Sequence, residues 1–354
     1  MFTWVFAAML AVSPPAMEAD PQVEPPSQVM QLPPALRARV QAEVLAGDVS
    51  SQRSRFNRLL HLAFDDNGLG LLYQDDATVS VEQAYSTRTA NCLSFTMLFI
   101  ALAREAGLDA YPQEIRETLA WHQDSGILYR VDHINAVVRI AARGYVVDIA
   151  GDSVIKLREP ARVSDQRLLA HYYNNLAMRD LEQGRIAPAL QNMGMALDLD
   201  PGFATNWSNA GVLYLRNGDE AAAARAYAKA LALEPGNTSA LVNMANLAQR
   251  RGEHDRESQF RERLERQQKN DPFFHFLQAT EYERTGDYPR AIEHYQRAIR
   301  LHGDEHRFYA ALAHAYVLAG DTRQAIKALT RAAWLSTGKT RVEYQSQLDG
   351  LRKR

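Results

Sequence analysis

The one cysteine of the chain, Cys92, stands where a thiol is readily activated. Asn91 is a good helix N-cap and a mainly apolar run follows it, so we expect a helix that begins at Cys92 and ends near Ala106. A cysteine in the first turn of a helix lies beside free backbone N–H groups and the positive end of the helix dipole, which favour thiolate over thiol. Cys92 is therefore a candidate nucleophile, with an inert packed thiol as the alternative.

A base for this thiol, and a group to orient that base, stand on segments further along the chain. Runs rich in Val, Ile and Tyr predict three strands, over 127–131, 133–141 and 144–149. Arg143 and Gly144 stand between the last two runs and predict a hairpin. His133 opens one strand and Asp148 closes its partner, so both should lie at one end of the hairpin. Thiol, imidazole and carboxylate would then form a nucleophilic triad, with a structural role for His133 as the alternative and Asp152 as a second candidate carboxylate.

Acyl transfer by such a triad also needs hydrogen-bond donors for the negative charge that develops on the carbonyl oxygen. The backbone N–H of Cys92 is one natural donor. Tyr73 and Gln74 are the nearest upstream side chains that can supply another, although neither stands in a clear motif. The sequence leaves the second donor open.

The segments NCLSFTMLFIALAREAGLDA, DHINAVVRI and GYVVDIAGD follow one another in the order found in the transglutaminase-like core of papain-like thiol enzymes. The chain resembles this family over about 65–155, although the aromatic residue often found after the family's histidine is absent at 134–136. The resemblance implies an α+β domain with Cys92 as nucleophile, His133 as general base and acid, and Asp148 as the residue that orients His133. It also implies chemistry on peptide or isopeptide bonds through a thioester, with no cofactor.

The second half of the chain repeats with a period of 34 residues. The period is marked by five glycines: Gly184, Gly218, Gly252, Gly286 and Gly320. Small residues recur at fixed distances from each glycine, which predicts stacked helical hairpins with the glycine in the turn. The pattern resembles the tetratricopeptide repeat, with five copies over about 167–338, the best of them at 204–237. Residues 340–353 predict a polar capping helix.

Two features of the array bear on its function. Asn175, Asn209 and Asn243 recur at one phase on the first helix of successive repeats, where their amides could bind a peptide backbone. The alternative is that asparagine is only the usual residue at this phase. In the third copy Glu257 and Arg261 replace small and aromatic residues, so we expect the weakest packing of the array there.

Composition limits the remaining possibilities. The 354 residues are 46 % apolar and 23 % charged, with a net charge of −2, so nothing favours nucleic acid or an anionic membrane as a partner. A single cysteine excludes an intramolecular disulfide and a cysteine-rich zinc site, and the histidines show no metal-ligand spacing. His171, His275, His294 and His314 fall in repeat helices as surface or packing residues, whereas His122 falls in an expected loop.

The expected organisation has four parts: a signal peptide at 1–19, a proline-rich linker at 20–34, the thiol-enzyme domain at 35–160, and the repeats with their cap at 167–354. An export signal implies a periplasmic or secreted protein. The sequence thus predicts an exported thiol enzyme with a repeat array that binds a protein or peptide, and no membrane span. The alternative is an inactive peptide-binding scaffold that assembles complexes through its repeats. The oligomeric state is not predicted.

Overall fold

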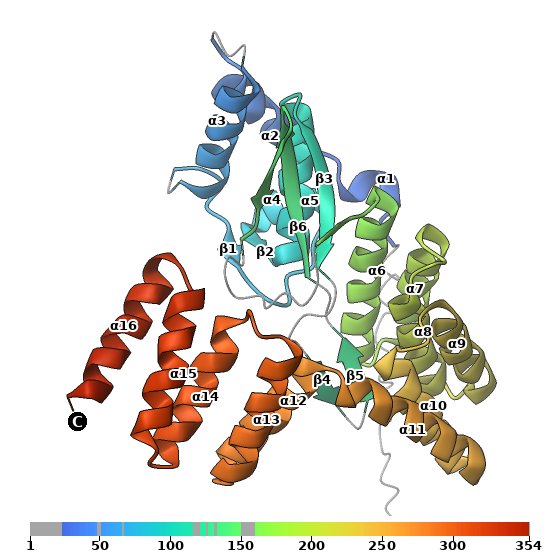
Figure 1. Cartoon of the computed structure of the whole chain (residues 1–354). Helices are drawn as coiled ribbons and strands as arrows, with labels where there is room; N and C mark the ends of the chain where they lie inside the picture. Colours follow the sequence, from blue (N-terminus) through green and yellow to red (C-terminus); the bar gives the residue numbers. More distant parts are fainter. Residues whose placement is uncertain are drawn as a thin grey trace, which may run out of the picture.

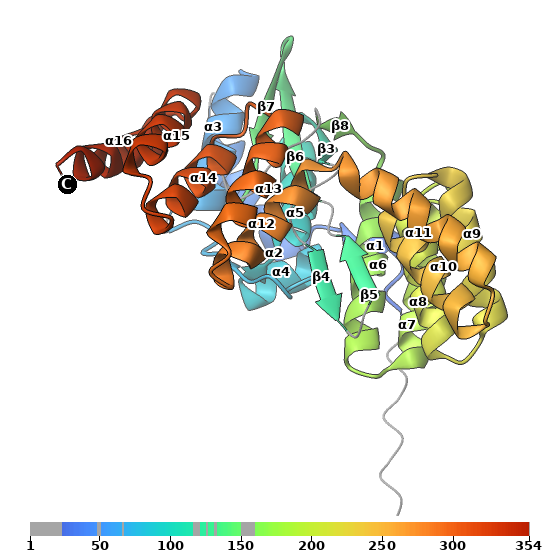
Figure 2. The same cartoon turned by 60° about the horizontal axis from the view of Figure 1, so that its bottom comes forward.

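The computed structural model describes residues 23–47, 51–65, 67–115, 121–124, 127–130, 133–149 and 160–353. The predicted signal peptide lies outside these residues. Within them, an α+β unit is followed by a long array of antiparallel helices, and helices α6–α11 and α12–α16 lie on different sides of the α+β unit (Figures 1 and 2). No described helix combines the length and apolar character needed to cross a bilayer.

The helical part of the α+β unit surrounds one apolar helix, α5. Its elements are α1 (Pro26–Val29), α2 (Pro34–Arg39), the π-helix η1 (Val40–Val44), α3 (Gln52–Phe64), β1 (Leu72–Tyr73), α4 (Val81–Thr87), β2 (Thr89–Ala90) and α5 (Cys92–Glu105). The segment expected to be a linker differs from that expectation, because it forms α1 and buries Val29 and Leu32 in the core that holds α5. Pro26 at the first position of α1 suits a helix start rather than an extended chain.

A four-stranded antiparallel sheet packs against α5, with strand order β7-β6-β3-β8. Its strands are β3 (Asp109–Ile115), β6 (His133–Ile140), β7 (Arg143–Val147) and β8 (Ala161–Arg162). The predicted hairpin is present as β6 and β7, but Arg143 and Gly144 belong to β7 and the turn lies at Ala141 and Ala142. Ala141 takes the positive φ of 54° that this tight turn requires. Strand β3, between α5 and the hairpin, was not predicted.

A separate hairpin, β4 (Trp121–Asp124) and β5 (Ile127–Arg130), contacts helices α8 and α10 of the array. The array consists of five helical pairs and a final helix. Its helices are α6 (Asp165–Glu182), α7 (Ile186–Leu199), α8 (Ala204–Arg216), α9 (Glu220–Leu233), α10 (Thr238–Arg250), α11 (His254–Lys269), α12 (Pro272–Arg284), α13 (Tyr288–Leu301), α14 (His306–Leu318), α15 (Thr322–Leu335) and α16 (Gly338–Arg352). The five periodic glycines all have φ between +68° and +83° and each separates the two helices of a pair, as predicted.

The predicted weak joint lies at α11. This helix has no buried residue, and Phe260 and Leu264 are only partly buried against the first core. That core extends from the α+β unit through the repeats to α10, whereas the buried residues of α12–α16 form two separate clusters. Glu257 and Arg261, the two departures from the repeat pattern, bond each other at 2.7 Å instead of entering the core.

Close helix packing inside a repeat depends on Gly211. A Cβ atom there would lie closer than 3.0 Å to three ring atoms of Tyr227, which is fully buried on α9 and has no room to move. We expect Gly211→Ala to lower the free energy of unfolding by about 1–3 kcal/mol through overpacking. Urea denaturation of the full chain measures the change.

Gly194 on α7 supplies the matched control, because a Cβ there meets nothing within 4 Å. Gly194→Ala should raise stability by up to about 1 kcal/mol through helix propensity. Equal effects of the two substitutions would contradict the packing argument.

Candidate functional site

Cys92 is the first residue of α5 and is half-buried. The helix begins there because the Asn91 side chain accepts a hydrogen bond from the backbone N–H of Ser94 at 2.9 Å, as predicted for an N-cap. The Asn91 amide in turn donates to the hydroxyl of Thr78 at 2.8 Å. The cap is therefore itself fixed, and the thiol lies where the free N–H groups of the first turn are closest.

The segment between β1 and α4 wraps around this helix start. Ser94 donates from its hydroxyl to the carbonyl of Ala77 at 3.1 Å and accepts from the backbone N–H of Val79 at 2.8 Å. The backbone N–H of Asn91 donates to the same Ala77 carbonyl at 3.1 Å. These bonds hold the chain before and after Cys92 in one arrangement.

His133 and Asp148 form a short, largely buried pair. The ring Nε2 of His133 lies 2.6 Å from Oδ2 of Asp148, and their side chains are 6 % and 15 % exposed. His133 is the first residue of β6, and Asp148 directly follows β7, whose last residue pairs with Ala136. The hydroxyl of Thr96 donates to the carbonyl of Ile134 at 3.1 Å and thereby ties α5 to β6 one residue beyond the histidine.

Cys92 lies close enough to His133 for the two side chains to interact and for Cys92 to raise the pKa of the imidazole. Because Nε2 is engaged by Asp148, the other ring nitrogen, Nδ1, is the atom left for the sulfur. Burial alone lowers the pKa of His133, but the hydrogen bonds and charges of Asp148 and Cys92 outweigh it and raise that pKa from 6.5 to about 9. The imidazole is thus protonated at neutral pH, the state in which it stabilises a thiolate.

Tyr73 is the further side chain that the structure brings to this group. Strand β1 pairs in parallel with β2, which places Tyr73 beside Ala90, two residues before the thiol. Its side chain is 46 % exposed, yet partial desolvation, a hydrogen bond to Asp75 and the charges of Cys92 and Asp148 raise the pKa of the phenol. Gln74 donates its backbone N–H to Ala90, and its side chain is exposed. Of the two upstream residues that the sequence singles out, Tyr73 is the one in electrostatic contact with the thiol.

The three asparagines proposed to bind peptide are not equally accessible. Asn209 and Asn243 are 5 % and 3 % exposed, and Asn175 is half-buried. The amide of Asn209 donates to the side-chain oxygen of Asn174 at 2.8 Å. The β5 strand contacts α8 and α10, the two helices that carry the buried pair. In this arrangement Asn209 and Asn243 are covered, so they bind peptide only if this face opens.

Other chemistry-bearing residues lie apart from Cys92 or outside the described ranges. Asp152 lies outside them, and His122 falls in β4 rather than a loop, with a side chain that is not described. His171 is buried on α6 against Glu114 of β3, at 2.9 Å. Among the described residues, no three His, Cys, Asp or Glu side chains are grouped to hold a metal ion.

Comparison with known proteins identifies the array. Models of the tetratricopeptide repeat match residues 204–237 and 284–333. No curated protein matches the chain.

Solved structures with similar helices include MamA from Desulfovibrio magneticus RS-1, at 20 % identity over 49 % of this chain and 96 % of that one, with a TM-score of 0.27. They also include YrrB, a repeat protein with an unusual peptide-binding site, at 17 % identity over 50 % of this chain and 92 % of that one, again with a TM-score of 0.27. The helices within 204–237 and 284–333 are tetratricopeptide repeats, and the other helical pairs of the array follow the same 34-residue period.

Proposed function

We propose that the α+β unit is a transglutaminase-like thiol enzyme that acts on peptide or isopeptide bonds, and that the repeats bind the protein it acts on or assembles with. One observation carries this proposal: His133 lies 2.6 Å from Asp148, and its pKa is raised by Asp148 and by the nearby Cys92. A half-buried thiol at a helix start, next to a protonated imidazole, is the arrangement expected of an activated nucleophile.

Each residue has a defined role in the proposed reaction. The thiolate of Cys92 attacks the carbonyl carbon, and the carbonyl π electrons move to the oxygen. His133 gives its proton to the departing amine as the C–N bond breaks, which leaves a thioester. His133 then takes a proton from water or from a second amine as that molecule attacks the thioester. The C–S bond breaks, and the Cys92 thiolate leaves beside the protonated His133. Asp148 keeps the ring oriented throughout.

The developing negative charge needs donors in this scheme. The backbone N–H of Cys92, at a helix N-terminus, is one, and the phenol of Tyr73 is our candidate for the second. The contact between Tyr73 and the charges of Cys92 and Asp148 supports that choice. Water as acceptor gives hydrolysis or deamidation, whereas an amine gives a crosslink.

The apolar segment at the start of the chain supports export to the periplasm or beyond as part of the same proposal.

The pH dependence of alkylation tests the proposal. Because Cys92 and Asp148 raise the pKa of His133 to about 9, the imidazolium persists from acidic pH up to that value and stabilises the thiolate throughout. Iodoacetamide should therefore modify Cys92 rapidly at pH 6–7. In His133→Gln the rate at pH 7 should fall about tenfold or more, because the imidazolium that stabilises the thiolate is gone. Mass spectrometry of the alkylated protein gives both rates.

His61 on α3 is a suitable control, because its side chain is 71 % exposed and bonds only locally to Asp65. His61→Gln should leave the alkylation profile unchanged. If the unaltered protein is alkylated at pH 7 no faster than His133→Gln, the triad does not function as an ion pair.

The second candidate function is a scaffold that binds a peptide without cleaving it. The family matches favour it, because both of them fall in the repeats. In that case alkylation of Cys92 would be slow, and a Cys92→Ala variant would bind its partner and support every function of the protein.

A further inference from the structure

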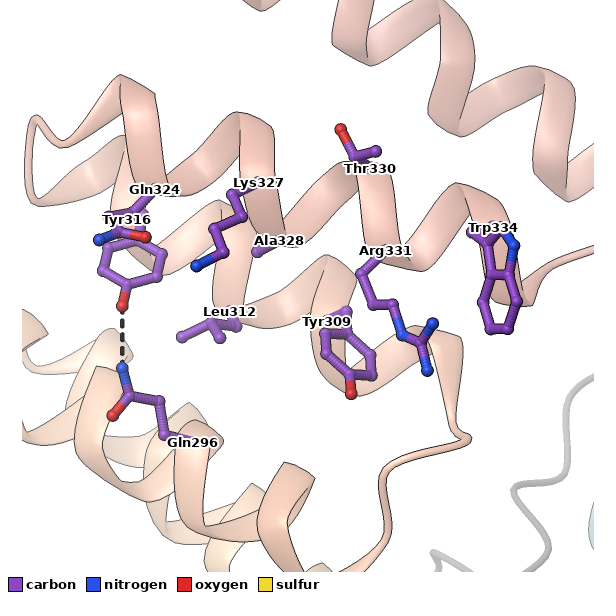
Figure 3. Close-up of a pocket in the computed structure, with 10 residues that line it drawn as sticks. All are labelled: Gln296, Tyr309, Leu312, Tyr316, Gln324, Lys327, Ala328, Thr330, Arg331 and Trp334. Carbon is purple, nitrogen blue, oxygen red and sulfur yellow. Dashed lines mark hydrogen bonds between the residues drawn. The ribbon is translucent and has the colours of Figure 1, made fainter.

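The last two repeats contain an open groove of about 610 Å³, a size typical of ligand sites. Helices α13, α14 and α15 line it (Figure 3). Its lining comprises Gln296, Tyr309, Leu312, Tyr316, Gln324, Lys327, Ala328, Thr330, Arg331 and Trp334. Figure 3 shows Lys327, Arg331 and Trp334 along α15, with Lys327 pointing toward Leu312 of α14 and Arg331 between Tyr309 and Trp334.

This groove lies on a different face of the array from the periodic asparagines. The asparagine phase of α8 and α10 corresponds, at 34-residue steps, to Ala311 on α14. At 3.6 residues per turn, Ala311 lies about 160° around that helix from Tyr309. The groove therefore lies on a different side of its helices from the asparagine phase.

The charged side chains among the described lining residues of the groove are all positive. Lys327 and Arg331 stand one turn apart on the same side of α15, and no carboxylate is among the lining residues that the structure describes. Within the described ranges, about half of the arginines of the array bond a nearby carboxylate, as Arg284 bonds Glu281 and Arg307 bonds Glu305. No such ion pair is found there for Lys327 or Arg331. Two adjacent cations thus face the groove with their charge available to a ligand.

Arg331 also contacts aromatic side chains of the groove. Trp334 is 66 % exposed, an unusual position for so large an apolar side chain. The guanidinium of Arg331 lies 4.1 Å from the centre of its ring and 5.9 Å from that of Tyr309. At the opposite end, the amide of Gln296 donates to the hydroxyl of Tyr316 at 2.9 Å. Cations, aromatic rings and amide groups therefore alternate along one short channel.

We propose that this groove binds an acidic peptide segment of a partner protein, with a carboxylate between Lys327 and Arg331 and a large apolar side chain against Trp334 and Tyr309. Charge complementarity and the adjacent aromatic wall select this ligand. Two cations in a chain of net charge −2 are too few for a nucleic-acid backbone. The inference deepens the protein-binding part of the proposed function and does not depend on Cys92.

Fluorescence anisotropy of labelled hexapeptides on the full chain tests this assignment. The probe is Glu-Glu-Phe-Leu-Glu-Glu, compared with one analogue that has Gln for every Glu and another that has Ala for Phe and Leu. Both analogues should bind about tenfold or more weakly than the probe. Binding should weaken about tenfold in Arg331→Gln, further in the double variant with Lys327→Gln, and similarly in Trp334→Ala.

Arg323→Gln is the matched control, because Arg323 is exposed on α15 but does not line the groove. It should bind the probe as the unaltered chain does, and so should Cys92→Ala, which separates this proposal from the enzymatic one. The variants are at exposed positions, and thermal unfolding verifies that they fold.

Three results would overturn the assignment. The first is that the probe fails to bind, or binds the folded Lys327→Gln, Arg331→Gln double variant equally well. The second is tighter binding of a labelled oligothymidylate with the same sensitivity to the variants, which would indicate a nucleic-acid site. The third is a dimer of the chain in analytical ultracentrifugation that Trp334→Ala converts to a monomer. The groove would then be an interface between two copies of the chain.

Discussion

Replacing Cys92 by alanine is expected to abolish turnover of a quenched fluorescent peptide library, with a loss of about 10⁴-fold or more. The reason is that no other side chain in this chain offers a thiol, so the covalent step has no substitute. His133→Ala should cost nearly as much, because a thiol without its base attacks poorly. The double variant should be no worse than either single one, since residues that act as a unit are not additive.

The matched control for the histidine is His61→Ala, which removes an exposed imidazole from the same domain and should leave turnover intact. Trapping of a thioester by hydroxylamine supplies a readout that a purely structural role of Cys92 would not produce. Turnover that survives undiminished in Cys92→Ala would rule out the thiol mechanism and leave the scaffold function.

The second large effect is on stability, at the junction between the sheet and the array. Glu114 is fully buried on β3, and its carboxylate lies 2.9 Å from Nε2 of His171 on α6. The imidazole also packs edge-on against Phe203, with ring centres 4.6 Å apart. Removing one partner of a buried ionisable pair costs about 3–5 kcal/mol, so His171→Ala should lower the free energy of unfolding by that amount. Urea denaturation with two spectroscopic probes measures it.

His314 offers the comparison, because it also bonds a glutamate, Glu283 at 3.0 Å, but its side chain is 62 % exposed. His314→Ala should cost no more than about 1 kcal/mol. Combining His171→Gln with Glu114→Gln should cost less than the sum of the single changes, because both ionisable groups are then removed. Equal losses in His171→Ala and His314→Ala would show that burial does not govern the pair.

The positions of Cys92 and of the array helices were predictable because local chemistry fixes them. An asparagine cap starts α5 at a defined residue, and each periodic glycine takes a positive φ that other residues disfavour, so helix ends could be read from residue types alone. His133 and Asp148 fall at one end of the predicted hairpin for the same reason, since neighbouring strands of a short hairpin have little freedom of register.

Features that depend on distant contacts were not predictable. Strand β3 contains Pro112, which argues against a strand, yet it pairs with β6 along its full length. The segment 20–34 is rich in proline and reads as a linker, but the described part of it is packed because α6 offers an aromatic surface: the hydroxyl of Tyr173 donates to the carbonyl of Glu24. Burial of Asn209 and Asn243 likewise follows from packing between elements that are far apart in sequence. No local sequence pattern specifies contacts between elements that are far apart along the chain.

The polar helix α11 divides the molecule into two folding units. Because its neighbours on either side share no common interior, a solvent-driven opening that begins at the C-terminus should stop at this helix rather than spread through the chain. Amide hydrogens in α12–α16 should then exchange with deuterium together, in a cooperative step of lower free energy than the one that exposes the interior of the half that contains Cys92. Unfolding by mechanical force or cleavage by a protease should stop at the same helix. The segment α12–α16 could therefore unfold and refold while Cys92, His133 and Asp148 keep their arrangement.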